Sequence, residues 1–179
     1  MATQYGGYMG KVLKIDLTVM GVLTIVWTIW DAINDPMMGA IMDKAFSKSK
    51  NKNGKFRPWL LRATPLLAVS AIAMWTVPTL LDGIPLLVCL FSFKILYEGA
   101  YTMFNIPMGS LLSSMATNDE ERAQLSSARG FGSTVSSLVP VFTAPLILAH
   151  FGDTNAIAYQ VCAIVFGVVG FVLCLLHYL

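Results

Sequence analysis

Long apolar runs separated by short polar segments are the dominant pattern of this chain. A helix of about 20 residues, rising about 1.5 Å per residue, crosses the ~30 Å hydrocarbon core of a bilayer. The runs are too long for the strands of a membrane barrel, which need only about ten residues. The pattern therefore predicts an all-α integral membrane protein with five transmembrane helices, at about residues 17–42, 58–81, 84–115, 119–149 and 156–179.

The polar segments predict how these helices are oriented. Residues 1–16 are polar and glycine-rich, and we expect them to be external and loosely ordered. Residues 43–57 are the one strongly basic loop, which the positive-inside rule assigns to the cytoplasm. The amino end is then outside and the carboxyl end inside. The basic side chains of this loop are Lys44, Lys48, Lys50, Lys52, Lys55 and Arg57.

Composition supports a membrane protein. Of the 179 residues, 56% are hydrophobic and 12% are charged, with a mean hydropathy of +0.67. A soluble domain carries about twice that charged fraction. The three cysteines lie inside apolar runs without the spacing of a disulfide framework or a zinc site. We therefore expect a multi-pass protein of the cell (plasma or inner) membrane.

Two carboxylates, Asp31 and Asp35, interrupt the first apolar run. Each costs at least ~2.5 kcal/mol to insert at mid-membrane. Residues four apart share one face of a helix, and two like charges there do not both stay ionised without a counter-charge. The pair therefore predicts a site for a proton or a small cation. The alternative, a solvated helix end, predicts polar residues next, whereas Met37 and Met38 follow the proline at 36.

The third run carries a polar stripe made of Lys94, Glu98, Tyr101 and Asn105. At about 100° per residue these positions fall within a sector ~60° wide, which indicates a face toward a polar cavity or other helices. Lys94 and Glu98 can equally neutralise one another as an i, i+4 pair. Tyr101 and Asn105 suit hydroxyl groups of a ligand, with interhelical hydrogen bonding as the alternative.

The fourth helix is predicted to begin at a capping box formed by Thr117 and Glu120. Arg129 lies well inside this helix, among small residues that let helices approach closely. Because arginine keeps its charge, it must either reach the cytoplasmic surface or point into a cavity toward the acids or a ligand's oxygens. We favour the cavity.

Four segments, taken together, resemble the glycoside–pentoside–hexuronide:cation symporters of the major facilitator superfamily. The resemblance runs in order from about Val12 to the carboxyl end, and the segments occur at compatible spacing. They are Trp30–Gly39, Gly54–Trp59, Tyr101–Leu111, and Glu121–Leu125 leading to Arg129.

The resemblance implies twelve helices in two six-helix halves, with this chain supplying helices two to six. Residues 1–16 would then be external or a remnant of helix one, and helix one and the carboxyl-terminal half would be missing partners. The implied function is symport of a sugar or glycoside with sodium or a proton. Such folds bind substrate and ion near the midplane and rock the halves around them. The fragment alone is therefore not expected to transport.

The resemblance also implies roles for individual residues. Asp31 and Asp35 match the cation-binding acids, which would hold sodium if sodium is the coupling ion. Tyr101, Thr102, Asn105 and Arg129 match substrate-facing positions, and Lys55 and Arg57 match a gating loop. The family's best-known member has an aspartate at the position of Asn105 and a tryptophan at that of Gly109, which affects the expected sugar contacts.

Two other functions are consistent with part of the pattern. One is an integral-membrane assembly or regulatory subunit whose acids only join helices. The other is an intramembrane aspartyl protease, but that reaction needs acids on two facing helices, whereas Asp31 and Asp35 share one. We expect no enzyme activity, no cofactor beyond the coupling ion, and no nucleic-acid partner, with membrane lipids around the helices.

Overall fold

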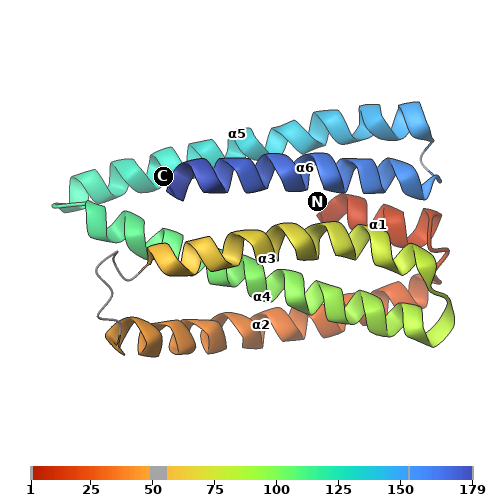
Figure 1. The fold of residues 1–179 in the computed structure, drawn as a ribbon, viewed down its shortest axis with the longest axis horizontal. Helices are drawn as coiled ribbons and strands as arrows, with labels where there is room; N and C mark the ends of the chain where they lie inside the picture. The colour runs from red at the N-terminus through yellow and green to blue at the C-terminus, as the bar shows by residue number, and fades with distance from the viewer. Residues whose placement is uncertain (1, 49–55, 153, 179) are drawn as a thin grey trace.

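The fold is a bundle of long helices lying side by side, described by a computed structural model for residues 2–48, 56–152 and 154–178. Within these residues every regular element is helical (Figure 1). The elements are α1 (Ala2–Lys11), α2 (Leu17–Lys48), α3 (Arg57–Thr76), the 3-10 helix η1 (Val77–Leu80), α4 (Gly83–Met115), α5 (Asp119–Phe151) and α6 (Ala156–Tyr178).

Five of these helices, α2 to α6, are long and apolar enough to cross a membrane. Their first residues agree with the predicted starts to within one position, and α2 continues through Pro36 to Lys48, beyond the predicted end. Only 11% of the most apolar window of α2 and 6% of that of α5 is buried inside the bundle. These helices therefore present long apolar surfaces outward.

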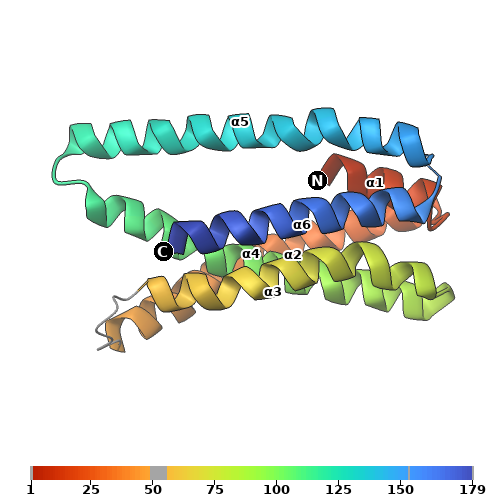
Figure 2. The same cartoon turned by 45° about the horizontal axis from the view of Figure 1, so that its top comes forward.

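Successive long helices run in opposite directions, so α2 and α4 are parallel (Figure 1). We call the end of the bundle that holds residues 12–16, 81–82, 152 and 154–155 the turn end. The opposite end, with residues 43–48 and 116–118, is the basic end. Helix α3 packs between α4 and α6, α2 packs against α4, and α5 packs along α6 (Figures 1 and 2).

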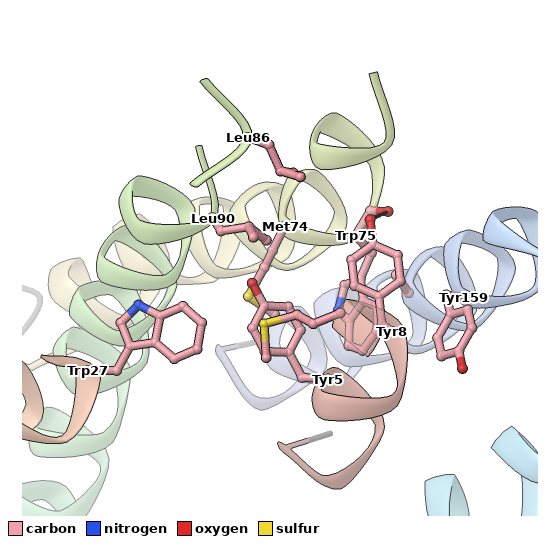
Figure 3. Close-up of a cluster of buried hydrophobic side chains, with 10 residues drawn as sticks. Tyr5, Tyr8, Trp27, Met74, Trp75, Leu86, Leu90 and Tyr159 are labelled. Atoms are coloured by element: carbon pink, nitrogen blue, oxygen red, sulfur yellow. Dashed lines mark hydrogen bonds between the residues drawn. The ribbon is translucent and has the colours of Figure 1, made fainter. Parts of the chain in front are cut away.

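A cluster of buried aromatic side chains holds α1 against the bundle near the turn end (Figure 3). The Tyr8 side chain is fully buried, and its hydroxyl donates to the Trp75 carbonyl of α3 at 2.8 Å. The Tyr8 ring lies 5.0 Å from the Trp75 ring and 5.4 Å from the Tyr159 ring of α6, centroid to centroid. Our expectation that residues 1–16 are loosely ordered is therefore wrong for residues 2–11, because their tyrosines bury large aromatic areas.

The ends of two helices are fixed by side-chain caps. At α2, the Asp16 carboxylate accepts from the Thr18 backbone amide at 2.8 Å, and this hydrogen bond lowers the pKa of Asp16 below its ordinary value. At α5, Asn118 is the N-cap and accepts from the Glu121 amide at 2.8 Å, while Glu121 accepts from the Thr117 amide. The predicted capping box is thus displaced by one residue, because the extended residue is Asn118.

The three cysteines, at positions 89, 162 and 174, are free and half-buried on the spanning helices. This agrees with the prediction that they form no disulfide framework.

Candidate functional site

One threonine hydroxyl of α4 bonds to two consecutive residues of α2. Asn34, only 2% exposed, donates its side-chain amide to the Thr102 hydroxyl at 3.1 Å. Thr102, 6% exposed, donates that hydroxyl to the Asp35 carboxylate at 3.0 Å. The hydroxyl therefore accepts from one side chain and donates to the other, which fixes the direction of the Asp35 side chain.

Asp31 lies one turn earlier on α2, and its surroundings differ from those of Asp35. It borders a cavity of about 530 Å³ between α1, α2, α3 and α4. The α2 side of this cavity also includes two threonines, whose hydroxyls donate to carbonyls of their own helix. Its walls are formed by Tyr5, Gly6, Met9, Met20, Thr24, Trp27, Thr28, Asp31, Met74, Lys94, Tyr97, Glu98 and Tyr101.

The polar stripe of α4 lines the same cavity. Lys94 and Glu98 form an ion pair, with side chains 21% and 18% exposed. The rings of Tyr97 and Tyr101 stack with centroids 6.5 Å apart. The sequence left open whether Lys94 and Glu98 face a cavity or neutralise one another, and the structure shows that they do both.

Asn105, the last residue of the predicted stripe, points to a separate depression toward the basic end. Its side-chain carbonyl accepts from Arg129 of α5 at 2.6 Å. A methyl group on Gly109 would lie 3.3 Å from the Arg129 guanidinium, so the glycine allows this close approach to α4. Arg129 is exposed at this open depression, and its side-chain partner there is the Asn105 carbonyl, while the acids of α2 line other surroundings.

The structure therefore places the predicted residues in three groups. Asp31 and Tyr101 line the large cavity, Asp35 is bonded to Thr102, and Asn105 is bonded to Arg129. Of the predicted gating residues, Lys55 lies outside the described residues and Arg57 begins α3.

The oxygen atoms around Asp35 suit a small hard cation. The Asp35 carboxylate, the Thr102 hydroxyl and the Asn34 amide oxygen are the kinds of ligand that such cations take. Within the described residues there is no group of three or more His, Cys, Asp or Glu side chains placed to hold a metal ion. Oxygen ligands of this kind suit a hard cation or a proton more than a transition metal.

Sequence reasoning missed the cavity wall contributed by α1 and by Trp27. The spacing of Tyr5, Tyr8 and Met9 is that of one helical face, and it could have indicated a docked helix. Trp27 lies four residues before Asp31, which predicts the same face.

Comparison with known proteins identifies the family. A model of the family described as MFS/sugar transport protein matches residues 1–179. The uncharacterized symporter YnaJ of Bacillus subtilis (strain 168) is 30% identical over 165 residues, 89% of this chain and 34% of the relative. The isoprimeverose transporter of Lactiplantibacillus pentosus is 30% identical over 166 residues, 90% of this chain and 33% of the relative.

The sodium-dependent lysophosphatidylcholine symporter 1 of Xenopus tropicalis is 30% identical over a shorter stretch of 110 residues, 62% of this chain and 20% of the relative. The chain spans about a third of the length of the two bacterial relatives. These relatives are transporters, which at the level of the family argues against an enzyme. The chain belongs to the MFS/sugar transport protein family, in agreement with its resemblance to the glycoside–pentoside–hexuronide:cation symporters, and is a multi-pass membrane protein of that symporter family.

Proposed function

We propose that this chain forms the cation-binding part of a symporter that couples sodium or proton entry to uptake of a sugar or glycoside. Asp31 and Asp35 bind the coupling cation, and Tyr101, Asn105 and Arg129 contact the substrate. The observation that carries the proposal is the Asn34–Thr102–Asp35 hydrogen-bonded chain, which holds a carboxylate inside an apolar helix. A carboxylate that is held in one orientation on an apolar helix, with no ion-pair partner among the described residues, is suited to binding a cation reversibly.

Cation binding would control, through its charge, whether the carrier can switch between its outward-facing and inward-facing states. Two uncompensated carboxylates on one helix raise the free energy of any conformation that encloses them in a low-dielectric environment. A bound cation reduces this electrostatic cost. Thr102 touches Asp35 and follows Tyr101 directly in the chain, so an ion at Asp35 affects α4 where the substrate residues begin. The role of Thr102 is therefore cation binding in this proposal, in place of the substrate contact implied by the resemblance.

The remaining sequence of the complete protein is part of the proposal. The bacterial relatives are about three times as long as the matched region, and alternating access needs two halves that rock against each other. Residues 1–179 alone are therefore not expected to transport. Lys55 and Arg57 would act at the cytoplasmic gate.

The test is uptake of radiolabelled isoprimeverose and of radiolabelled lysophosphatidylcholine by the protein expressed from its complete gene. Sodium chloride and choline chloride are compared at two pH values, since the names of the relatives suggest both substrates and one coupling ion. Asp35→Asn should reduce cation-dependent uptake at least about tenfold, as expected for loss of ~1.4 kcal/mol or more of ion binding.

The matched control is Asp43→Asn, which removes an exposed carboxylate from the basic end of the same helix and should leave uptake unchanged. Unchanged cation dependence in Asp35→Asn would remove that residue from the ion site and leave Asp35 with a structural role.

A further inference from the structure

Helices α2 and α4 share a register that is set by the Thr102–Asp35 hydrogen bond. Because the two helices are parallel, equal steps along each one reach the same height in the bundle (Figure 1). One turn toward the turn end, Glu98 on α4 is level with Asp31 on α2. One turn further, Lys94 is level with Trp27. All four of these side chains line the same cavity, as this register requires.

The charges in this cavity do not balance. Among the described residues that line it, Asp31 and Glu98 are acidic and Lys94 is basic. The Lys94 ammonium pairs with Glu98 on its own helix, and it lies 5.8 Å from the centroid of the Tyr97 ring. Asp31 is thereby left without that ammonium, and one further monovalent cation would make the cavity neutral.

We propose that Lys94 is an internal competitor of the coupling cation, and that Glu98 holds Lys94 away from Asp31. The inference rests on the proposed function, since it takes Asp31 as a cation ligand. The lysine side chain has a flexible four-carbon stem and a compact charge, so its ammonium can be shared between two carboxylates at the same height. With the coupling cation bound, Lys94 stays on Glu98. Without it, the ammonium is shared between Asp31 and Glu98, and the cavity keeps one net negative charge that the next cation can neutralise.

The two partners of the ion pair are then positioning residues with opposite effects on cation binding. Glu98→Gln releases the ammonium to Asp31 and should weaken cation binding about tenfold, whereas Lys94→Gln removes the competitor and should tighten it by a similar factor. The double variant should resemble Lys94→Gln, because Glu98 has no role once the competitor is gone. An ion pair that is only structural predicts a different result: both single variants lose stability, and the double variant recovers it.

The experiment is isothermal titration of the detergent-purified protein, expressed from its complete gene, with sodium chloride and with choline chloride as the blank. Proton uptake is followed in parallel with a pH electrode, since either ion can be the coupling ion. Lys44→Gln, which removes an exposed lysine at the basic end of α2, is the control and should bind the cation as the wild type does. Thermal unfolding of every variant shows whether it is folded, and Lys94→Arg, which keeps the charge, should lack the tightening.

The outcomes separate this inference from the proposed function. Opposite shifts in Glu98→Gln and Lys94→Gln support it. Shifts in the same direction, with binding abolished by Asp31→Asn, overturn it and leave the proposed function standing. A wild type that takes up neither sodium nor protons, or an Asp31→Asn variant that binds as the wild type does, overturns both.

Discussion

The Thr102 hydroxyl links the other two polar side chains of the hydrogen-bonded chain in the candidate site. It is buried, it accepts from Asn34 and it donates to Asp35. A hydroxyl has one proton. Because Thr102 donates it to the Asp35 carboxylate, it cannot also donate it to a backbone carbonyl of its own helix. This distinguishes Thr102 from Thr24 and Thr28, whose hydroxyls donate to carbonyls one turn back in their own helix.

Replacing Thr102 by valine keeps the shape of the side chain and removes both hydrogen bonds. The buried Asn34 amide then lacks its partner on α4, and we expect a loss of about 1–3 kcal/mol in the free energy of unfolding. Because Asp35 also loses its orientation, sodium chloride should raise the unfolding temperature less than it does in the wild type. Thr102→Ser keeps the hydroxyl and is the control. If valine and serine give the same salt-dependent stabilisation, the hydroxyl does not position the carboxylate.

At the scale of single elements, α1 is the helix whose position depends most on aromatic contacts. Its two buried tyrosines differ in a useful way. The Tyr8 hydroxyl donates to the Trp75 carbonyl, whereas the Tyr5 hydroxyl is buried without a hydrogen-bond partner among the described residues. An unpaired buried hydroxyl costs free energy, while a paired one contributes it.

Tyr8→Phe should therefore lower the free energy of unfolding by about 1 kcal/mol, and Tyr5→Phe should leave it unchanged or raise it. Both substitutions remove one oxygen from the same short helix, so each controls for the other. Thermal unfolding in detergent, followed by tryptophan fluorescence, measures the difference. Equal destabilisation by the two substitutions would mean that the hydroxyls do not determine how α1 docks.

Sequence patterns predicted the long helices far better than α1. A continuous apolar run fixes a membrane helix almost alone, because its backbone must bond internally in lipid. The segment before Leu17 instead contains three glycines, at positions 6, 7 and 10, and its helix depends on Trp75 and Tyr159, which are distant in sequence. The cap of α5 shows the same limit at one-residue scale, since Thr117 and Asn118 are both good N-cap residues.

For the whole molecule, the apolar runs predicted how many helices could span a membrane but not which faces meet one another. Membrane helices are apolar on nearly all sides, so hydropathy carries little information about partners. The acid pair shows this directly. Its spacing predicted one shared face for Asp31 and Asp35, but not that on this face Asp31 would line a cavity and Asp35 would bond to Thr102. The side chains of α4 that face each acid determine these different surroundings.

The orientation of the molecule across the membrane is the last property that the sequence predicts and that can be measured directly. The positive-inside rule assigns the basic end to the cytoplasm, because translocating lysines and arginines is unfavourable. Asp82 and Asp119 form a matched pair for this test. Both are exposed, Asp82 precedes α4 at the turn end, and Asp119 begins α5 at the basic end.

In the protein expressed from its complete gene, with cysteines 89, 162 and 174 replaced by alanine, a membrane-impermeant maleimide should label Asp82→Cys in intact cells. Asp119→Cys should react only after the membrane is permeabilised, because its side chain then lies on the cytoplasmic side with the basic loop. The reverse labelling would place the basic loop outside. The cavity beside Asp31 lies closer to the turn end than the Asn105–Arg129 pair does. With the turn end in the cytoplasm, the cation would reach this cavity from the cytoplasm instead of from outside.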